Sequence, residues 1–240
     1  MKFTLGFIFG LALALAISSR AETVYASVWT FGGDNTWTPK EWREIFKSTQ
    51  EFYKERLNVK IKVVSWRNNH QLSICAKRFK YNTEKGYGNC LLKKTARARN
   101  KFAGFNLFLT PPIPSGFGDT YVGGISTGIC QPHGGTAMVH GKRISTHTFE
   151  DGGNAGWEMT RLAVIHEIGH VALGMHHPED VGRATPINIM DTEALGYLVG
   201  EYQIKNKISG EWENFRDVLP LTKFSKWEVK QCLGAHTVAP

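Results

Sequence analysis

The sequence predicts an α/β fold in a single domain, and two observations lead to this prediction. Segments rich in β-branched and aromatic residues surround an amphipathic helical segment, in the order strand, helix, strand and then further strands. The 240 residues contain no internal repeat and no low-complexity linker, and they suffice for one sizeable hydrophobic core. We therefore expect the strands to form one sheet that the helices cover.

The first three elements are predicted between residues 24 and 66. Val24 to Phe31 is expected to form a strand because β-branched and aromatic residues dominate it. The run Thr38-Pro39-Lys40-Glu41 has the pattern of a capping box with proline at the first helical position, so a helix should begin there and end near Leu57. Apolar residues recur along this helix at helical spacing and should pack on the sheet. Val59 to Trp66 is the next predicted strand.

Three more strands and a second long helix are predicted further along the chain. Phe105 to Leu109 is expected to be a strand that stops at Pro111-Pro112. Tyr121 to Ser126 and Gly135 to Val139 are predicted as companion strands, and the glycines of the first permit either a close approach or a bulge. Gly156 to Gly174 is predicted as a helix with apolar faces.

A basic segment interrupts this pattern. Arg67 to Lys101 contains ten Lys or Arg residues against Glu84 alone, in a chain whose net charge is +8. Such a segment could hold an acidic partner, either an anionic polymer, a lipid surface or an acidic protein. We favour the simpler interpretation of a solvated, charged excursion. No nucleic-acid-binding module is legible, so no nucleic acid is expected as a partner.

Residues 1 to 21 are predicted to be an export signal. Lys2 gives a basic start, Leu5 to Ile17 is apolar, and Ser19-Arg20-Ala21 offers small residues for cleavage before Glu22. The apolar run is short for a membrane span, and no other stretch approaches the required length. We therefore expect residues 22 to 240 to form one secreted domain, extracellular or periplasmic, without stable membrane insertion.

Four cysteines follow in this exported chain, namely Cys75, Cys90, Cys130 and Cys232. An even number of cysteines in an oxidising compartment predicts two disulfides, for which three pairings are possible. The alternative is that the four are free buried thiols.

The most informative stretch runs from His166 to His177. His166 and His170 are four residues apart, so on a helix both imidazoles project from one face and can bind one metal ion. Zinc accepts such nitrogens at about 2.0 to 2.1 Å. Glu167 lies about 100° around the helix from His166, which suits a general base that acts on zinc-bound water. The alternative is a chance occurrence of these residues on an ordinary amphipathic helix.

The helix must end before a third ligand can reach the same metal ion. If the helix continued, His177 would lie about 10 Å beyond His170 along its axis. Gly174 tolerates the left-handed conformation that ends helices, so the chain can fold back after it. The spacing from the glycine selects His177 as the third ligand, whereas the count from His166 selects His176.

This stretch and Ile189-Met190-Asp191 resemble the signature of the metzincin zinc endopeptidases, H-E-x-x-H-x-x-G-x-x-H followed by a methionine turn. The present chain has one more residue between His170 and Gly174 than that signature. Its segment Leu173 to His177 is similar to the L-G-M-x-H of the reprolysin (adamalysin) branch, which favours His177 over His176. The extra residue is expected to be absorbed as a π-bulge in the helix.

The metzincin resemblance implies a fold and a set of ligands. The fold would be α/β with a mixed, mostly parallel twisted sheet, a zinc-ligand helix, a methionine turn under the metal and a C-terminal helix, here expected within Leu219 to Leu233. Tyr121 to Ser126 would be the edge strand that lines the cleft and pairs with extended substrates. His166, His170 and His177 would bind one catalytic Zn²⁺.

The same resemblance bears on the cysteines. The pairing of Cys130 with Cys232 is similar to a bridge of reprolysins, and it would tie the segment beside the cleft to the C-terminal helix. Cys75 with Cys90 is then expected to close a local loop.

The activity implied is that of a secreted zinc-dependent endopeptidase, a monomer that hydrolyses protein or peptide substrates with Glu167 as general base. The chain departs from the family at two places. Thr192 stands where astacin-like and serralysin-like members have a tyrosine, and Pro178 stands where reprolysins commonly have an acid. Two alternatives are a catalytically silent, zinc-stabilised secreted binding protein and a cell-wall amide hydrolase that uses the same zinc chemistry.

Overall fold

The computed structural model describes thirteen separate stretches of the chain, which hold all the elements discussed below. They are residues 21–30, 37–68, 74–75, 84–110, 113–114, 121–122, 124–130, 134–140, 155–177, 189–190, 203–205, 212–214 and 223–237. The predicted export signal therefore lies outside the described residues, except for its last residue, Ala21. Within the described stretches, no helix has the length and apolar character needed to cross a membrane.

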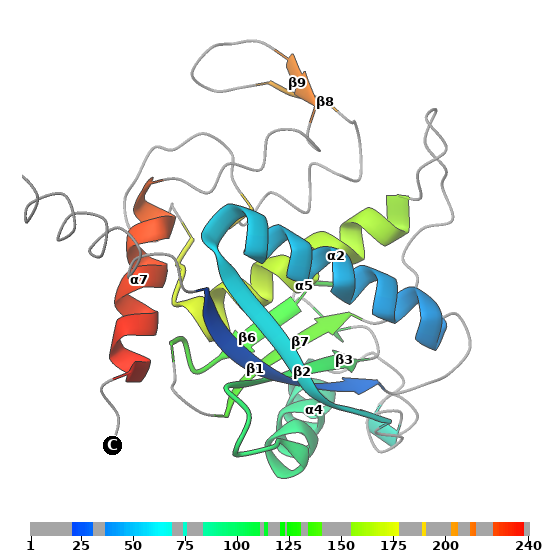
Figure 1. Ribbon diagram of the computed structural model, residues 1–240. Coiled ribbons are helices and arrows are strands. Elements are labelled where there is room, and N and C mark those ends of the chain that lie inside the picture. The colour runs from blue at the N-terminus through cyan, green and yellow to red at the C-terminus, as the bar shows by residue number, and fades with distance from the viewer. Residues whose placement is uncertain are drawn as a thin grey trace, which may run out of the picture.

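A five-stranded sheet with the order β2-β1-β3-β7-β6 forms the centre of the molecule (Figure 1). Its strands are β1 (Glu22–Thr30), β2 (Val59–Asn68), β3 (Phe105–Thr110), β6 (Gly124–Thr127) and β7 (Gly135–His140). All neighbouring pairs are parallel except β6 and β7, which are antiparallel. The predicted mixed, mostly parallel α/β sheet is confirmed.

One predicted strand is divided in the structure. Within Tyr121 to Ser126, the residues of β5 (Tyr121–Val122) pair with β4 (Ile113–Pro114) in a separate two-stranded sheet. The residues from Gly124 onward belong to β6 and form the edge of the main sheet. The prediction of an edge strand is therefore confirmed from Gly124 onward, whereas Tyr121 and Val122 pair outside the main sheet. A third small sheet pairs β8 (Gln203–Lys205) with β9 (Trp212–Asn214).

Helix α2 (Pro39–Leu57) begins at the predicted capping box. The Thr38 hydroxyl accepts a hydrogen bond from the Glu41 N–H at 3.3 Å, and the Glu41 carboxylate accepts one from the Thr38 N–H at 2.7 Å. The helix ends at Asn58, which adopts the left-handed conformation with φ 54°. Its buried side is mostly apolar and packs on the sheet, as its periodicity predicts; the buried residues are Trp42, Ile45, Phe46, Thr49, Phe52 and Tyr53.

Helix α5 (Ala155–Leu173) lies beside α2 on the same face of the sheet (Figure 1). Strand β3 shows how the two faces are divided, because successive side chains of a strand point to opposite sides. Leu107 and Leu109 join the large core with α2 and α5, whereas Phe108 belongs to a second, smaller core cluster. The C-terminal helix α7 (Lys223–Thr237) packs against α5 through Val229 and Leu233, and it confirms the helix predicted at this end of the chain.

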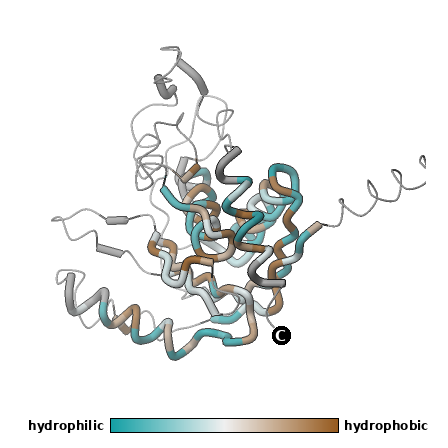
Figure 2. Tube along the Cα trace, turned by 90° about the vertical axis from the view of Figure 1, so that its left-hand side faces the viewer, coloured by the Kyte–Doolittle hydropathy of each residue, from teal (hydrophilic) through white to brown (hydrophobic). Residues whose placement is uncertain are grey.

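Helix α4 (Glu84–Ala98) covers the second face of the sheet, within the basic segment. Leu91 and Thr95 are one turn apart and buried, and Leu91 packs in the smaller core cluster with Phe108 and Met138. In Figure 2 the described residues of α4, at the bottom, alternate between hydrophobic and hydrophilic. The prediction of a solvated excursion is therefore wrong for this part, because basic residues such as Lys93 surround a short apolar stripe.

All four cysteines form disulfides, and the predicted pairing is confirmed. Cys75 pairs with Cys90 near the middle of α4, and Cys130 pairs with Cys232 of α7. The second bridge closes a sequence separation of 102 residues and ties the segment after β6 to the C-terminal helix.

Candidate metal centre

Helix α5 positions the first two histidines of the site. His166 and His170 lie one turn apart on this helix, and each is only 6 % exposed. Their Nε2 atoms are 3.1 Å apart. The helix is held in place by the core on nearly every side, since the residues from Leu162 to Met175 are all buried. The two imidazoles therefore have fixed positions.

A sharp turn at the end of α5 brings the third histidine to the first two. Gly174 adopts φ 69°, which reverses the chain after Leu173. The Nε2 atom of His177 then lies 3.0 Å from that of His166 and 2.9 Å from that of His170. These three side chains form a group that can hold a metal ion.

The extra residue of the motif is accommodated at the helix end. The helix is α-helical through Leu173, so the predicted π-bulge is wrong. Instead, the N–H of Met175 reaches back to the carbonyl of Gly169 at 3.0 Å, while the N–H of Gly174 still bonds to the His170 carbonyl. This wide turn accommodates the additional residue between His170 and Gly174, and the helix before it keeps its regular α-helical form.

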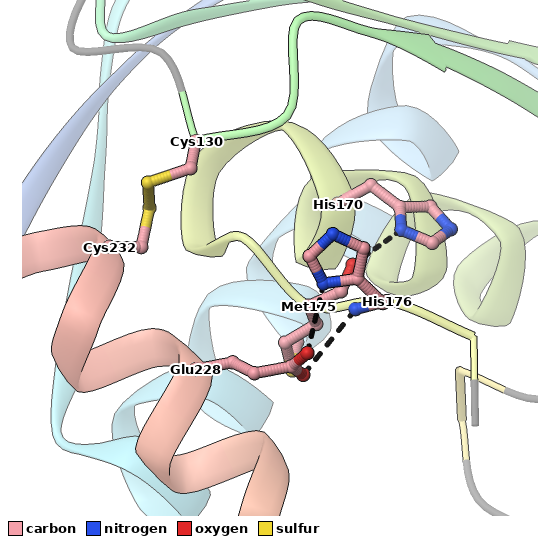
Figure 3. A network of polar contacts seen from close by, with 6 residues as sticks. All are labelled: Cys130, His170, Met175, His176, Glu228 and Cys232. Atoms are coloured by element: carbon pink, nitrogen blue, oxygen red, sulfur yellow. Dashed lines mark hydrogen bonds and ion pairs between the residues drawn. A yellow bond between two sulfur atoms is a disulfide. The ribbon is translucent and has the colours of Figure 1, made fainter. Parts of the chain in front are cut away.

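His176, the other sequence-based candidate, turns away from the three-histidine group. Figure 3 shows its ring beside Glu228 of α7, with Nδ1 2.9 Å from the carboxylate Oε1. The backbone N–H of His176 donates to the other oxygen of Glu228 at 3.4 Å. Glu228 was not a sequence candidate. Its distance of 52 residues from His176 leaves no local pattern that would have revealed it.

The hydrogen bonds of the imidazoles show which nitrogens face the centre of the group. His166 Nδ1 lies 2.7 Å from the carbonyl of Ile189, and His170 Nδ1 lies 2.6 Å from the carbonyl of Met175 (Figure 3). Since a carbonyl oxygen only accepts, each Nδ1 carries the proton and each Nε2 carries a lone pair. Lone pairs that converge at about 3 Å repel one another unless a cation lies between them. The chemistry of these donors therefore fits a bound metal ion.

The predicted methionine lies against the same helix. Met190 is buried, and a Cβ added at Gly169 would come within 2.7 Å of its sulfur atom. A glycine at position 169, beside His170, therefore leaves the room that this methionine occupies. The residues after it, including Thr192, lie outside the described residues.

Glu167 is buried beside the edge strand β6. A Cβ added at Gly124 would lie 2.4 Å from the Glu167 Cγ, so the absence of a side chain there makes room for the carboxyl group. Burial raises the pKa of Glu167 to about 8, while a hydrogen bond from Ser126 partly opposes this rise. Among the described residues, Glu167 Oε2 is buried and has no hydrogen-bond partner. Such a group is suited to exchanging a proton near neutral pH.

Tyr53 of α2 is buried near enough to this carboxyl group to feel its charge. Its hydroxyl donates a hydrogen bond to the carbonyl of Ile165 in α5. Burial, and to a smaller extent the charge of Glu167, raise the pKa of Tyr53 well above 10. The phenol therefore stays protonated and links the two helices. No sequence pattern indicated this contact, because Tyr53 occupies an ordinary core position of the helix.

The raised pKa of Glu167 predicts that the stability of the metal-free protein depends on pH. The pKa is about 8 in the folded chain against an ordinary value of 4.5. The contribution of this group to the free energy of unfolding is therefore complete below pH 4.5 and is lost as the pH rises to about 8, at about 1.4 kcal/mol per pH unit. Relative to Glu167→Gln, which does not titrate, wild type should lose several kcal/mol between about pH 5 and about pH 9.

Urea denaturation of both proteins in the presence of a chelator measures this difference, and the comparison removes the shared titration of other groups. A difference between wild type and Glu167→Gln that is independent of pH would contradict the raised pKa.

Comparison with known proteins gives low similarity only. No family model and no curated protein matches the sequence. Among solved structures, archaemetzincin from Methanopyrus kandleri aligns with a TM-score of 0.45 and 17% identity, over 77% of this chain and 99% of that one. Metalloproteinase-II from Bacteroides fragilis aligns with a TM-score of 0.45 and 14% identity, over 89% of this chain. This chain covers 54% of that metalloproteinase.

Proposed function

We propose that this protein is a secreted zinc-dependent endopeptidase of the metzincin clan, in which His166, His170 and His177 bind one catalytic zinc ion. The observation that carries the proposal is the convergence of three Nε2 atoms, none more than 3.1 Å from another. Zinc binds imidazole nitrogens at about 2.0 to 2.1 Å, and a set of three protein ligands leaves a further position for water or substrate. This is the coordination of catalytic rather than structural zinc sites.

A bound zinc ion would supply Lewis acidity, which activates water and polarises the carbonyl of the scissile bond. Glu167 would accept a proton from the attacking water and deliver it to the departing amine nitrogen. Its burial and its place directly after His166 on α5 support this role, because a carboxyl group held beside the metal ligands can take up a proton and release it again.

The edge strand β6 supports a peptide substrate. It is the last strand of the main sheet, so one of its sides is not paired within that sheet. Ile125 and Thr127 are exposed, whereas Gly124 and Ser126 are half-buried next to Glu167. An extended peptide that pairs along this edge would pass beside the catalytic carboxyl group. A substrate chain of any length can bind in this way, which suits an endopeptidase.

The two disulfides support a location outside the reducing cytosol, since such bonds persist mainly in oxidising compartments. They agree with the predicted export signal. Secretion therefore belongs to the same proposal.

Zinc content and substrate cleavage together test this function. The purified full chain should bind about one zinc ion, cleave a denatured protein, lose this activity to a chelator and regain it when zinc is added back. Cleavage of muropeptides but not of proteins would favour a cell-wall amide hydrolase. A zinc-containing protein that cleaves neither substrate would favour a silent binding protein.

The contact between Gly124 and Glu167 gives a sharper prediction. Gly124→Ala adds a Cβ that would lie 2.7 Å from Glu167 Oε1, so the carboxyl group must shift. A displacement of about 1 Å in a catalytic group can reduce the rate about 100-fold. We therefore expect kcat/KM to fall by roughly that factor with unchanged zinc affinity, measured by peptide cleavage and by metal titration. Gly234→Ala is the matched control, because nothing lies within 4 Å of its added Cβ, and it should leave kcat/KM unchanged.

A further inference from the structure

The segment that carries the third histidine is held from two sides. Met175, which follows the turn at Gly174, is fixed by α5, since its N–H bonds to the Gly169 carbonyl and its own carbonyl accepts from His170 Nδ1. His176 is fixed by α7 through Glu228 (Figure 3). His177 comes next in the chain. Its position is therefore set by the two residues that precede it.

Glu228 holds both the side chain and the backbone of His176. Its Oε1 lies 2.9 Å from the ring Nδ1, and its Oε2 accepts the backbone N–H at 3.4 Å. Two contacts to one residue restrict its backbone as well as its side chain. Because His176 is followed directly by His177, the direction in which the chain enters the metal site depends on this carboxylate.

The burial of the two partners shows which one is the anchor. The side chain of Glu228 is 6 % exposed, whereas that of His176 is 45 % exposed. A buried carboxylate is costly unless hydrogen-bond donors surround it, and His176 supplies two of them. The pair therefore holds the partly exposed loop residue against the helix.

The disulfide gives this anchor a fixed base. Cys232 lies one turn after Glu228 on α7 and is bonded to Cys130. A Cβ added at Gly174 would lie 3.0 Å from the Cβ of Cys232 and 3.1 Å from that of Cys130. Helix α7 is thus covalently tied beside the turn that ends α5, and Glu228 projects from it toward His176 (Figure 3).

We propose that Glu228 is a positioning residue of the metal site, which acts through His176 to present His177 Nε2 to the zinc ion. The inference rests on the proposed zinc site and adds a role for α7 and for His176. Neither Glu228 nor His176 contacts the metal in this account. Partners that orient a ligand in this way typically change metal affinity by about 10- to 100-fold when they are removed.

Zinc affinity of the full chain, measured by competition with a chelating dye, tests the proposal. Glu228→Ala should weaken zinc binding about 10-fold or more, and His176→Ala should weaken it in the same direction. The double variant should bind no more weakly than Glu228→Ala, because both changes remove one interaction. Lys230→Ala is the control, since this residue is exposed on the same helix. The zinc affinity of this variant should equal that of wild type.

Glu228→Gln separates the two contacts. The glutamine carbonyl can still accept from His176 Nδ1, but its amide group cannot accept the backbone N–H. We expect the zinc affinity of Glu228→Gln to lie between that of wild type and that of Glu228→Ala. The visible absorption spectrum of the cobalt-substituted variants should also shift, because it reports the geometry of the ligands rather than the stability of the fold.

The following results would overturn the role of Glu228. Unchanged zinc affinity and an unchanged cobalt spectrum in Glu228→Ala, or losses that add in the double variant, would overturn the proposal. If Glu228→Ala does not fold, His176→Ala carries the test, because α7 is intact in it, and an unchanged affinity there would overturn the proposal as well. Wild type that binds no zinc would reject the proposed function itself, whereas wild type that binds zinc beside an unaffected Glu228→Ala would reject only the role of Glu228.

Discussion

Glu167→Gln is expected to keep its zinc ion and to lose at least about 100-fold in kcat. A general base contributes about 10²- to 10⁴-fold to a rate, and glutamine cannot accept the proton of the attacking water. Metal affinity should change little, because the group that can hold the metal consists of three histidines and does not include Glu167. Glutamine also nearly preserves the volume that Gly124 and the edge strand leave for this side chain.

The measurement is kcat and KM for a peptide substrate, with the zinc content of the same preparations. A loss of kcat at unchanged KM would mean that Glu167 acts in the transition state rather than in substrate binding. Full activity in Glu167→Gln would remove the general-base assignment. Loss of zinc from this variant would instead indicate that the carboxylate helps to hold the metal.

Glu158→Gln is a matched control for this substitution. Glu158 lies on the same helix and forms an ion pair with Arg161 at 2.9 Å, away from the histidines in sequence. A partly buried pair of this kind has a modest effect on stability. Its replacement should leave kcat unchanged, so a comparable loss in both variants would indicate general damage to α5.

The sequence was most informative where a local pattern is sufficient. The spacing of His166 and His170 on one helical face, the capping box at Thr38 and the glycine that ends α5 all depend on neighbours within one or two turns. Such patterns are fixed by backbone geometry and are therefore visible without a structure. The positions of the main strands along the chain follow from the same kind of local composition.

The rest of the site depends on contacts between distant segments. Glu228 reaches His176 across 52 residues, and Gly124 makes room for a carboxyl group on another element. The sequence pattern did not reveal that α4 packs on the sheet. Only Leu91 and Thr95 of its fully described positions are buried, and basic residues surround them. No local spacing rule encodes these relations. They arise only when the sheet brings its edge and the helices together.

The choice between the two adjacent histidines also depends on a contact between distant segments. The spacing alone left His176 and His177 as alternatives, because the extra residue before Gly174 can be counted in two ways, and the family resemblance favoured His177. The structure distinguishes them by what each ring contacts. His177 lies with the other two imidazoles, and His176 lies with a carboxylate on α7.

His177→Ala is therefore expected to lose far more zinc affinity than His176→Ala. Loss of a direct ligand should exceed the 10- to 100-fold that is typical for an outer partner, while His176→Ala should stay within that range. Metal titration of both variants against wild type gives the ratio, and cleavage of a denatured protein should follow the zinc content of His177→Ala. Zinc binding that survives in His177→Ala but is lost in His176→Ala would reverse the assignment of the third ligand. Because the two residues are adjacent and the substitution is the same, general effects on the loop cancel, and the ratio reports which imidazole binds the metal.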